Sequence, residues 1–361
     1  MLTPSPTSTS LKLHPNDKWK AVSHLQKCIR RGWSHRIEPI TKALWDVDNA
    51  YLRYRLAVIA VEDVGIANLD KVHSLLEDKI NKRWVVAHGG IDGLVATMQE
   101  LAEGVKDRTA CSWGSNASRS ALENLTGEPW DALSPTRAAD MAWDTTLPHE
   151  VRAAAVFRAA GTDLFPHHDF PVMAGDWASW VDACTTRAGG MNATIETMVR
   201  SQKAMKEWHP AFLPLCHQAR VDAPRPDTLS PPKDWGDAGM FCGASIDGHT
   251  AEGKRAITAL WRSCPELRKG WIDLGWSGTD SEAIALLSKM VFLLEGGAVD
   301  KRLGYATAHE AETMQKTRWA ERAAMEGKPA ATVVWRHMEQ LIALRKREVE
   351  PALSSNIGMG W

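Results

Sequence analysis

Charge of one sign and long apolar runs are both missing from this 361-residue sequence. Its 43 lysine and arginine residues face 44 aspartate and glutamate residues, so a formal net charge of -1 provides no global field that would attract nucleic acid or an acidic membrane. The longest apolar run, residues 283–294, is interrupted by Ser288 and Lys289. A membrane-spanning helix needs about 20 apolar residues. We therefore expect no membrane contact and a cytoplasmic protein.

Paired cysteines and known catalytic signatures are also absent. None of the six cysteines forms a Cys-x-x-Cys pair, which favours reduced, buried thiols over a disulfide framework or a zinc site. The patterns G-x-S-x-G, H-E-x-x-H and G-x-G-x-x-G do not occur. Residues 1–10 lack the basic start and apolar stretch of a secretory signal. We expect no metal and no cofactor.

Amphipathic periodicity is present nearly everywhere. Residues 20–31, 51–64, 94–105 and 334–345 place apolar side chains at spacings of three and four, which predicts helices. Residues 83–87 could form a short strand, but a lone strand is unstable. Seventeen tryptophans stand against three tyrosines, and we interpret them mainly as core residues rather than base-stacking ones. The sequence therefore predicts an all-α, multi-helical protein.

Proline content suggests how the chain divides. Four prolines and little apolar content between residues 221 and 237 predict a linker. The predicted parts are a disordered tail at 1–16, a helical domain at 17–128, a helical extension at 129–220, a Pro-rich linker at 221–238 and a second helical domain at 239–361.

Two acids end an apolar helix at an unfavourable place. Glu62 and Asp63 follow the run Leu56–Val61 and precede Gly65, a residue suited to a positive φ at a helix end. The C-terminus of a helix carries partial negative charge, so each acid there is disfavoured by about 0.3–1 kcal/mol. An arginine from this helix or from a neighbour should compensate. We interpret the acids as a structural buried ion pair.

This segment resembles the helical region after the ATPase core in the MgsA/RarA family of clamp-loader-related AAA+ proteins, whose pattern is R-R-L-x-x-x-A-x-E-D-x-G-x-A. The matching residues are Arg55, Leu56, Ala60, Glu62, Asp63, Gly65 and Ala67. The resemblance covers about 90 residues, from Lys18 to Lys106. It implies a clamp-loader collar-like N-terminal half that forms homo-oligomers or docks on replication proteins near DNA. It implies no catalytic residue, because the family's ATPase chemistry has no counterpart here.

A second segment, residues 243–255, mimics a phosphate-binding loop, but His249 stands where that loop needs lysine. Thr250 is predicted to cap a helix that starts at Ala251. Asp247 and His249 would lie just before that helix and are the candidate catalytic residues. A simple capped turn remains the alternative interpretation. The residues that we expect to contact nucleic acid or phosphate are Arg30, Arg31, Trp33, Arg53, Arg55, Lys254 and Arg255.

Three functions fit these patterns. The first is a DNA-associated accessory protein of replication or recombination repair, which acts as an oligomerising or docking platform. The second is an enzyme acting on a nucleotide or nucleic acid, with Asp247, His249, Lys254 and Arg255 in one pocket beside Glu62 or Asp63. The third is an interaction module that does not contact DNA.

Overall fold

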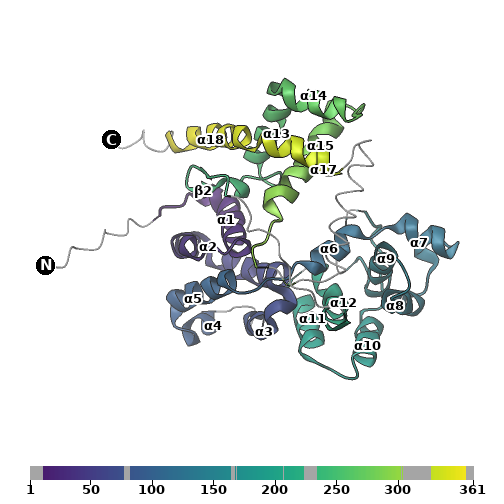
Figure 1. Cartoon of the computed structure of the whole chain (residues 1–361). Helices are drawn as coiled ribbons and strands as arrows, with labels where there is room; N and C mark the ends of the chain where they lie inside the picture. The colour runs from purple at the N-terminus through teal and green to yellow at the C-terminus, as the bar shows by residue number, and fades with distance from the viewer. Residues whose placement is uncertain are drawn as a thin grey trace.

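A computed structural model of the chain describes residues 11–76, 82–163, 167, 169–205, 207–222, 234–301, 303 and 327–354. Within these ranges the regular structure is helical, apart from a hairpin of two short antiparallel strands, β1 (Asp237–Ala238) and β2 (Phe241–Cys242). The predicted all-α, multi-helical fold is therefore confirmed. Figure 1 shows the helices in three groups, with the first and second groups side by side and the third above the first. None of the described helices is long and apolar enough to cross a membrane.

The first group holds the segment with the two acids. Its elements are η1 (Pro15–Asp17), α1 (Lys18–Arg30), η2 (Ser34–Arg36), α2 (Ile37–Ile59), the π-helical turn η3 (Ala60–Val64), η4 (Gly65–Asn68), α3 (Leu69–Leu76), α4 (Lys82–Ala87) and α5 (Gly90–Glu103). The backbone of α2 is interrupted at Asp48, where φ is -159° and ψ is 81°. The carboxylate of Asp48 accepts a hydrogen bond from the Tyr51 backbone N–H and so caps the second half of α2. This second half is buried from Leu56 to Ile59.

The second group surrounds the alanine-rich helix α9, which is buried along most of its length. Small side chains let α8 pack closely against α9. The elements are α6 (Thr109–Asn116), α7 (Arg119–Thr126), η5 (Trp130–Ala132), α8 (Pro135–Trp143), α9 (His149–Ala160), α10 (Trp177–Arg187), α11 (Ala193–Ala204), η6 (His209–Phe212) and α12 (Leu213–Asp222). Helix α11 contacts α3, so one continuous core joins the first and second groups.

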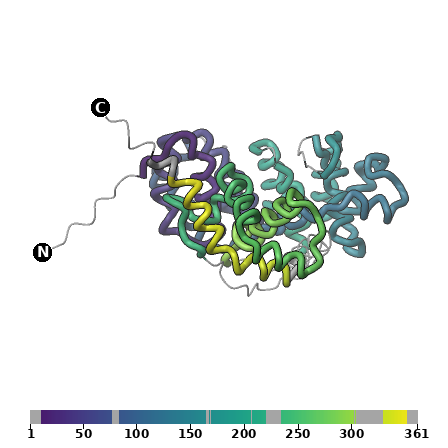
Figure 2. Tube along the Cα trace, turned by 90° about the horizontal axis from the view of Figure 1, so that it is seen from above, coloured from purple at the N-terminus to yellow at the C-terminus, as the bar shows by residue number. Residues whose placement is uncertain are grey.

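The third group has its own core, which includes Leu260, Trp271 and Leu287. Its elements are η7 (Gly243–Ser245), α13 (Ala251–Ser263), α14 (Pro265–Asp273), α15 (Asp280–Val291), the π-helical turn η8 (Phe292–Gly296), α17 (Gly327–Arg336) and α18 (Met338–Ser354). Figure 2 shows α18 running from the third group across the first helices. Leu341 of α18 belongs to the third group's core, and Val349 belongs to the larger core.

Several local predictions can be compared with these elements. Residues 83–87 lie within α4 and not in a strand, because their backbone continues the helix that packs against α5. All six cysteines are buried and free, as expected. The tryptophans at 113, 130, 180 and 271 are fully buried, which confirms the core interpretation at those positions. Most of the predicted tail (1–16) and of the Pro-rich linker (221–238) lies outside the described residues, and the domain boundaries stay a prediction.

Candidate functional site

A cavity of about 380 Å³ lies between α1, the second half of α2, the loop before α13 and the start of η8. Its wall combines aromatic, cationic and acidic side chains. The lining residues are Trp19, Val22, Ser23, Gln26, Lys27, Arg30, Tyr51, Arg55, Glu62, Asp247, His249, Thr250 and Phe292. The cavity is therefore built from parts of the chain that are more than 200 residues apart in sequence.

The floor of the cavity is an ion-pair network around the two acids. Arg30 Nη2 lies 2.7 Å from Glu62 Oε1, and the Nε of Arg30 also pairs with Asp63. Arg108 adds contacts of 3.1 Å to Glu62 Oε1 and 2.8 Å to Asp63 Oδ1. Gln26 Nε2 donates to both carboxylates. Neighbouring arginines thus compensate the acids, and the purely structural role of the pair stays a prediction.

These partners explain why Glu62 stays ionised in a largely buried position. Burial by itself would raise the pKa of Glu62, but the charges of Arg30, Arg108 and Arg55 outweigh burial and hold the pKa well below its usual range. Asp63 is fully buried and has Arg30 and Arg108 as partners. Buried carboxylates of this kind are costly unless they are paired and hydrogen-bonded.

Gly65 brings Arg108 to the network. Its φ of 49° and ψ of -133° turn the chain directly after the two acids, in a conformation that glycine adopts readily. The turn lets the Asp107 backbone N–H donate to the Asp63 carbonyl oxygen at 3.1 Å. A Cβ atom on Gly65 would lie 2.9 Å from the Asp107 carbonyl oxygen, so a larger residue would push away the segment that carries Arg108.

The wall opposite α2 comes from the loop before α13. Lys27 Nζ lies 2.6 Å from Asp247 Oδ2, and both side chains are buried. Burial would raise the pKa of Asp247, but the charge of Lys27 and the hydrogen bonds from His249 and Lys27 hold it well below its usual range. The Thr250 hydroxyl accepts from the Gly253 N–H and caps α13 as predicted.

Two donors of the cavity wall lack acceptors. Arg55 Nε and Tyr51 Oη are buried atoms with no hydrogen-bond partner among the described residues. Burial raises the pKa of Tyr51 to about 12, so its hydroxyl keeps the proton and remains a donor. Buried polar groups are almost always hydrogen-bonded, and exceptions point to water, an ion or a ligand. Tyr51 and Arg55 are one helical turn apart, so both donors face the same space.

An aromatic rim borders this pair of donors. Trp19 is 62% exposed and meets the Tyr51 ring edge-on, with centroids 4.9 Å apart. Phe292 meets the His249 ring in a similar way at 5.6 Å. An exposed indole beside a cationic cavity can stack on a planar group that enters from solvent.

The structure brings five of the predicted site residues to this cavity, namely Arg30, Arg55, Glu62, Asp247 and His249. Asp247 accepts from the His249 backbone N–H at 2.9 Å, and the His249 ring nitrogen lies 3.3 Å from the same carboxylate. Asp63 belongs to the ion-pair network of the floor but does not itself line the cavity.

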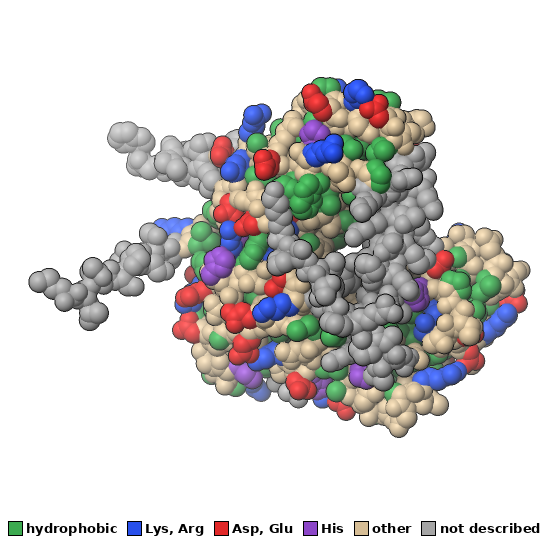
Figure 3. Space-filling view, viewed as in Figure 1, with side chains coloured by type: hydrophobic (Ala, Val, Ile, Leu, Met, Phe, Trp, Pro, Cys, Tyr) green, Lys and Arg blue, Asp and Glu red, His purple; other side chains and the backbone are tan. Residues whose placement is uncertain are grey.

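The other predicted residues lie elsewhere. Arg31 donates to the Glu295 carbonyl oxygen and stacks on Trp33, with its guanidinium carbon 4.9 Å from the ring centroid. Arg53 donates to the Asn49 carbonyl oxygen of its own helix. Lys254 and Arg255 are exposed on α13, and Arg255 pairs with Glu348 at 2.6 Å. On the face drawn in Figure 3, acidic and basic side chains of the described residues are intermixed rather than gathered in one basic patch.

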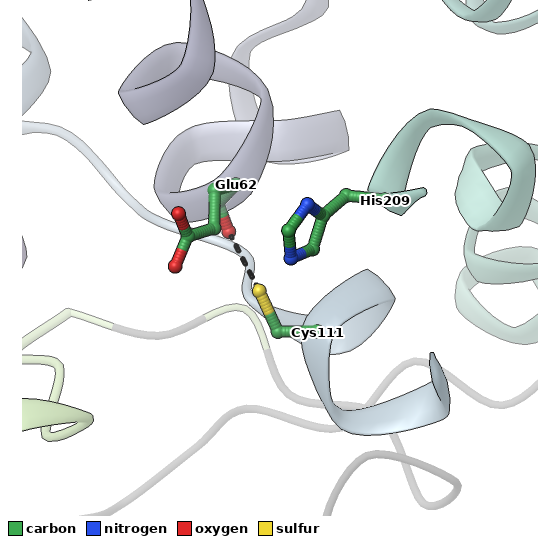
Figure 4. A group of neighbouring side chains, drawn as sticks. All are labelled: Glu62, Cys111 and His209. Carbon is green, nitrogen blue, oxygen red and sulfur yellow. Dashed lines mark hydrogen bonds between the residues drawn. The ribbon is translucent and has the colours of Figure 1, made fainter. Parts of the chain in front are cut away.

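A cluster of potential metal ligands lies at the other side of Glu62 (Figure 4). One ligand atom each of Glu62, Cys111 and His209 lies within 4.8 Å of the other two. The Cys111 thiol donates to the Glu62 backbone carbonyl at 3.7 Å. Burial lowers the pKa of His209 to about 4, and burial raises the pKa of the Cys111 thiol far above its usual value.

Sequence reasoning missed Tyr51, Trp19, Phe292, Arg108 and this cluster. The spacing of Tyr51 and Arg55 could have indicated a shared helix face, whereas Arg108, Cys111 and His209 carry no local signal. Comparison of the chain with protein-family models, curated proteins and solved structures finds no match.

Proposed function

We propose that this chain is a DNA-associated accessory protein that holds a phosphate group of DNA or of a nucleotide in the cavity between α1, α2 and the loop before α13. The observation that supports the proposal most is the pair of buried donors without acceptors, Arg55 Nε and Tyr51 Oη. Phosphate oxygens are strong acceptors, and the planar guanidinium of arginine matches them in a bidentate geometry.

The charges of the cavity direct an anion to Arg55. Lys27 is offset by Asp247, and Arg30 and Arg108 are offset by Glu62 and Asp63. Arg55 Nε has no hydrogen-bond partner among the described residues, although the charge of Arg55 also acts on Glu62 and Glu207. An anionic ligand would supply the acceptor that Arg55 Nε lacks, while Trp19 at the rim is placed to stack on an adjacent base.

The role in replication or recombination repair, and the homo-oligomer or docking platform, come from the resemblance of residues 55–67. One observation agrees with that resemblance: the helix is buried from Leu56 to Val61 and closes on two paired acids and a positive-φ glycine. Light scattering of the purified chain, alone and with DNA, tests the self-association. A strict monomer that binds no DNA at low salt would contradict the proposal.

An enzyme acting on the same ligand is the second candidate. It is favoured by one observation: the buried carboxylate of Asp247 orients His249, whose side chain is 78% exposed at the cavity. An oriented imidazole beside a bound phosphate could act as a general base toward water. Of the four residues expected in this active site, Asp247 and His249 line the cavity, whereas Lys254 and Arg255 do not.

Fluorescence anisotropy with labelled single-stranded and double-stranded DNA at low salt tests the binding site. We expect Arg55→Met to weaken binding at least tenfold, because a hydrogen bond to a charged group contributes about 1.5–3 kcal/mol. Arg53→Met is the matched control, since Arg53 lies two residues away and bonds to its own helix. We expect it to bind like the parent chain. Equal losses in both variants would assign the effect to general surface charge and overturn the cavity as the site.

A further inference from the structure

We propose that Glu62, Cys111 and His209 form a binding site for one divalent transition-metal ion of the zinc type. The three residues come from three separate elements, the turn η3, helix α6 and the turn η6, and lie next to one another (Figure 4). This inference does not depend on DNA or nucleotide binding.

The spacing fits a single ion once the Glu62 carboxylate turns toward Cys111 and His209 (Figure 4). The three ligand atoms lie within 4.8 Å of one another. Bonds from zinc to sulfur, nitrogen and oxygen are about 2.0–2.3 Å long, so two ligand atoms of a tetrahedral site lie about 3.3–3.8 Å apart, and the side chains would close by about 1 Å around the ion. Carboxylate, thiolate and imidazole together are a donor set for zinc or cobalt rather than for calcium or magnesium.

His209 contributes a buried imidazole to the cluster. Its side chain is only 8% exposed, and its Nδ1 atom has no hydrogen-bond partner in the part of the chain that the structure describes. In Figure 4 the ring nitrogen nearer to the Cys111 sulfur is Nε2, the one remote from Cβ, so Nε2 would bind the ion and Nδ1 would be the second ring nitrogen.

The arginines around Glu62 are consistent with this role. Ligating carboxylates are commonly held by a second layer of hydrogen bonds, and Gln26, Arg30 and Arg108 provide that layer here. The charges of Arg30 and Arg108 cancel those of Glu62 and Asp63. When the ion binds, the Cys111 S–H bond breaks, its proton goes to solvent, and the thiolate offsets one of the two charges of the ion.

Three protein ligands leave a fourth position open. Glu62 also lines the cavity, so this position is close to the space beside Arg55. An oxygen atom of a small ligand in the cavity, or a water molecule, could complete a tetrahedral site there.

The test uses the full chain, stripped with a chelator and titrated with Co²⁺. We expect one Co²⁺ per chain, a near-ultraviolet cobalt–thiolate charge-transfer band, and release of one proton in weak buffer. Cys111→Ser should remove the band, and His209→Ala should lower the affinity at least tenfold, in the range found when metal-site residues are changed. Cys184→Ser, a change of another buried cysteine, should leave the band intact.

The proton release and the band are measured on the unchanged chain, so they test the site even if a variant fails to fold. Circular dichroism of each variant checks its fold. Absence of the band in the parent chain would overturn the site, as would a band that persists in Cys111→Ser. Loss of the site with DNA binding retained would leave the proposed function standing.

Discussion

Individual residues matter most in this protein where charge is buried. Arg30 is 2% exposed and contacts Glu62, Asp63 and the Gly296 carbonyl oxygen. Removal of one partner from a buried ion pair costs about 3–5 kcal/mol, because it leaves an uncompensated charge in the interior. We therefore expect the network to favour a single arrangement of α1, η3 and η8.

His24 should make the stability of the fold sensitive to acid. It is 4% exposed, and its Nδ1 accepts from the Cys242 backbone N–H at 2.8 Å. Burial, with the charge of Arg36 added, lowers the pKa of His24 from 6.5 to about 4. Between these values the unfolded chain binds the proton and the folded chain does not. Stability contributed by neutral His24 is complete above pH 6.5 and is lost as the pH falls toward 4.

Urea unfolding of the parent chain and of His24→Asn checks this prediction. Asparagine offers an acceptor oxygen near the position of Nδ1 but does not titrate. When the pH is lowered from about 7 to about 4.5, we expect the free energy of unfolding of the parent chain to fall by about 2–3 kcal/mol more than that of the variant. Equal losses would show that His24 is not the titrating group.

The end of α2 is the element on which the site depends most. The helix passes through a π-helical turn, which places Glu62 toward the cavity and Asp63 beneath it, and then stops at Gly65. π-helical turns inside helices frequently occur at functional positions. The chain then returns through residues 106–109 alongside the turn and supplies Arg108.

Gly65→Ala should destabilise the protein more than Gly127→Ala. Both glycines have a positive φ, 49° and 70°, so both changes introduce backbone strain of about 1–3 kcal/mol. Only at Gly65 would the added Cβ also meet backbone, the Asp107 carbonyl oxygen at 2.9 Å, whereas nothing lies within 4 Å at Gly127. Guanidinium unfolding measures both. If Gly127→Ala lowers the free energy of unfolding as much as Gly65→Ala does, the contact with the Asp107 carbonyl oxygen does not contribute to the destabilisation.

At the scale of the whole molecule, buried polar contacts join the third group to the first. Lys27 of α1 pairs with Asp247, and Arg30 and Arg31 donate to the carbonyl oxygens of Gly296 and Glu295 at the end of η8. Helix α18 contributes to both cores. A ligand in the cavity would contact both sides of this junction, so binding and docking of the third group should be coupled.

The pair of Lys27 and Asp247 should show strong energetic coupling across 220 positions of sequence. In a double-mutant cycle with Lys27→Met and Asp247→Asn, we expect a coupling of at least about 1 kcal/mol, because the pair is buried. The exposed pair Arg187 and Asp140 is the control and should couple by less than about 0.5 kcal/mol. Hydrogen exchange should also increase in α13 of Lys27→Met. A cycle with no coupling would mean that the pair does not hold the junction.

The sequence alone determined the local features of this protein. Amphipathic spacing predicted the helices, the run Leu56–Val61 predicted a buried segment, and Thr250 predicted the cap of α13. These signals succeed because helical periodicity and capping involve residues within a few positions of each other. Residues 83–87 show the limit, since a short apolar run fits either a strand or a helix until its neighbours are known.

Only the tertiary structure decided which residues meet. The sequence required an arginine beside Glu62 and Asp63, but packing selected Arg30 and Arg108 rather than Arg53. Lys27 meets Asp247, and Cys111 meets His209, because segments that are far apart in sequence pack together in space. Such distances depend on how whole helices dock, and no local pattern of residues encodes them.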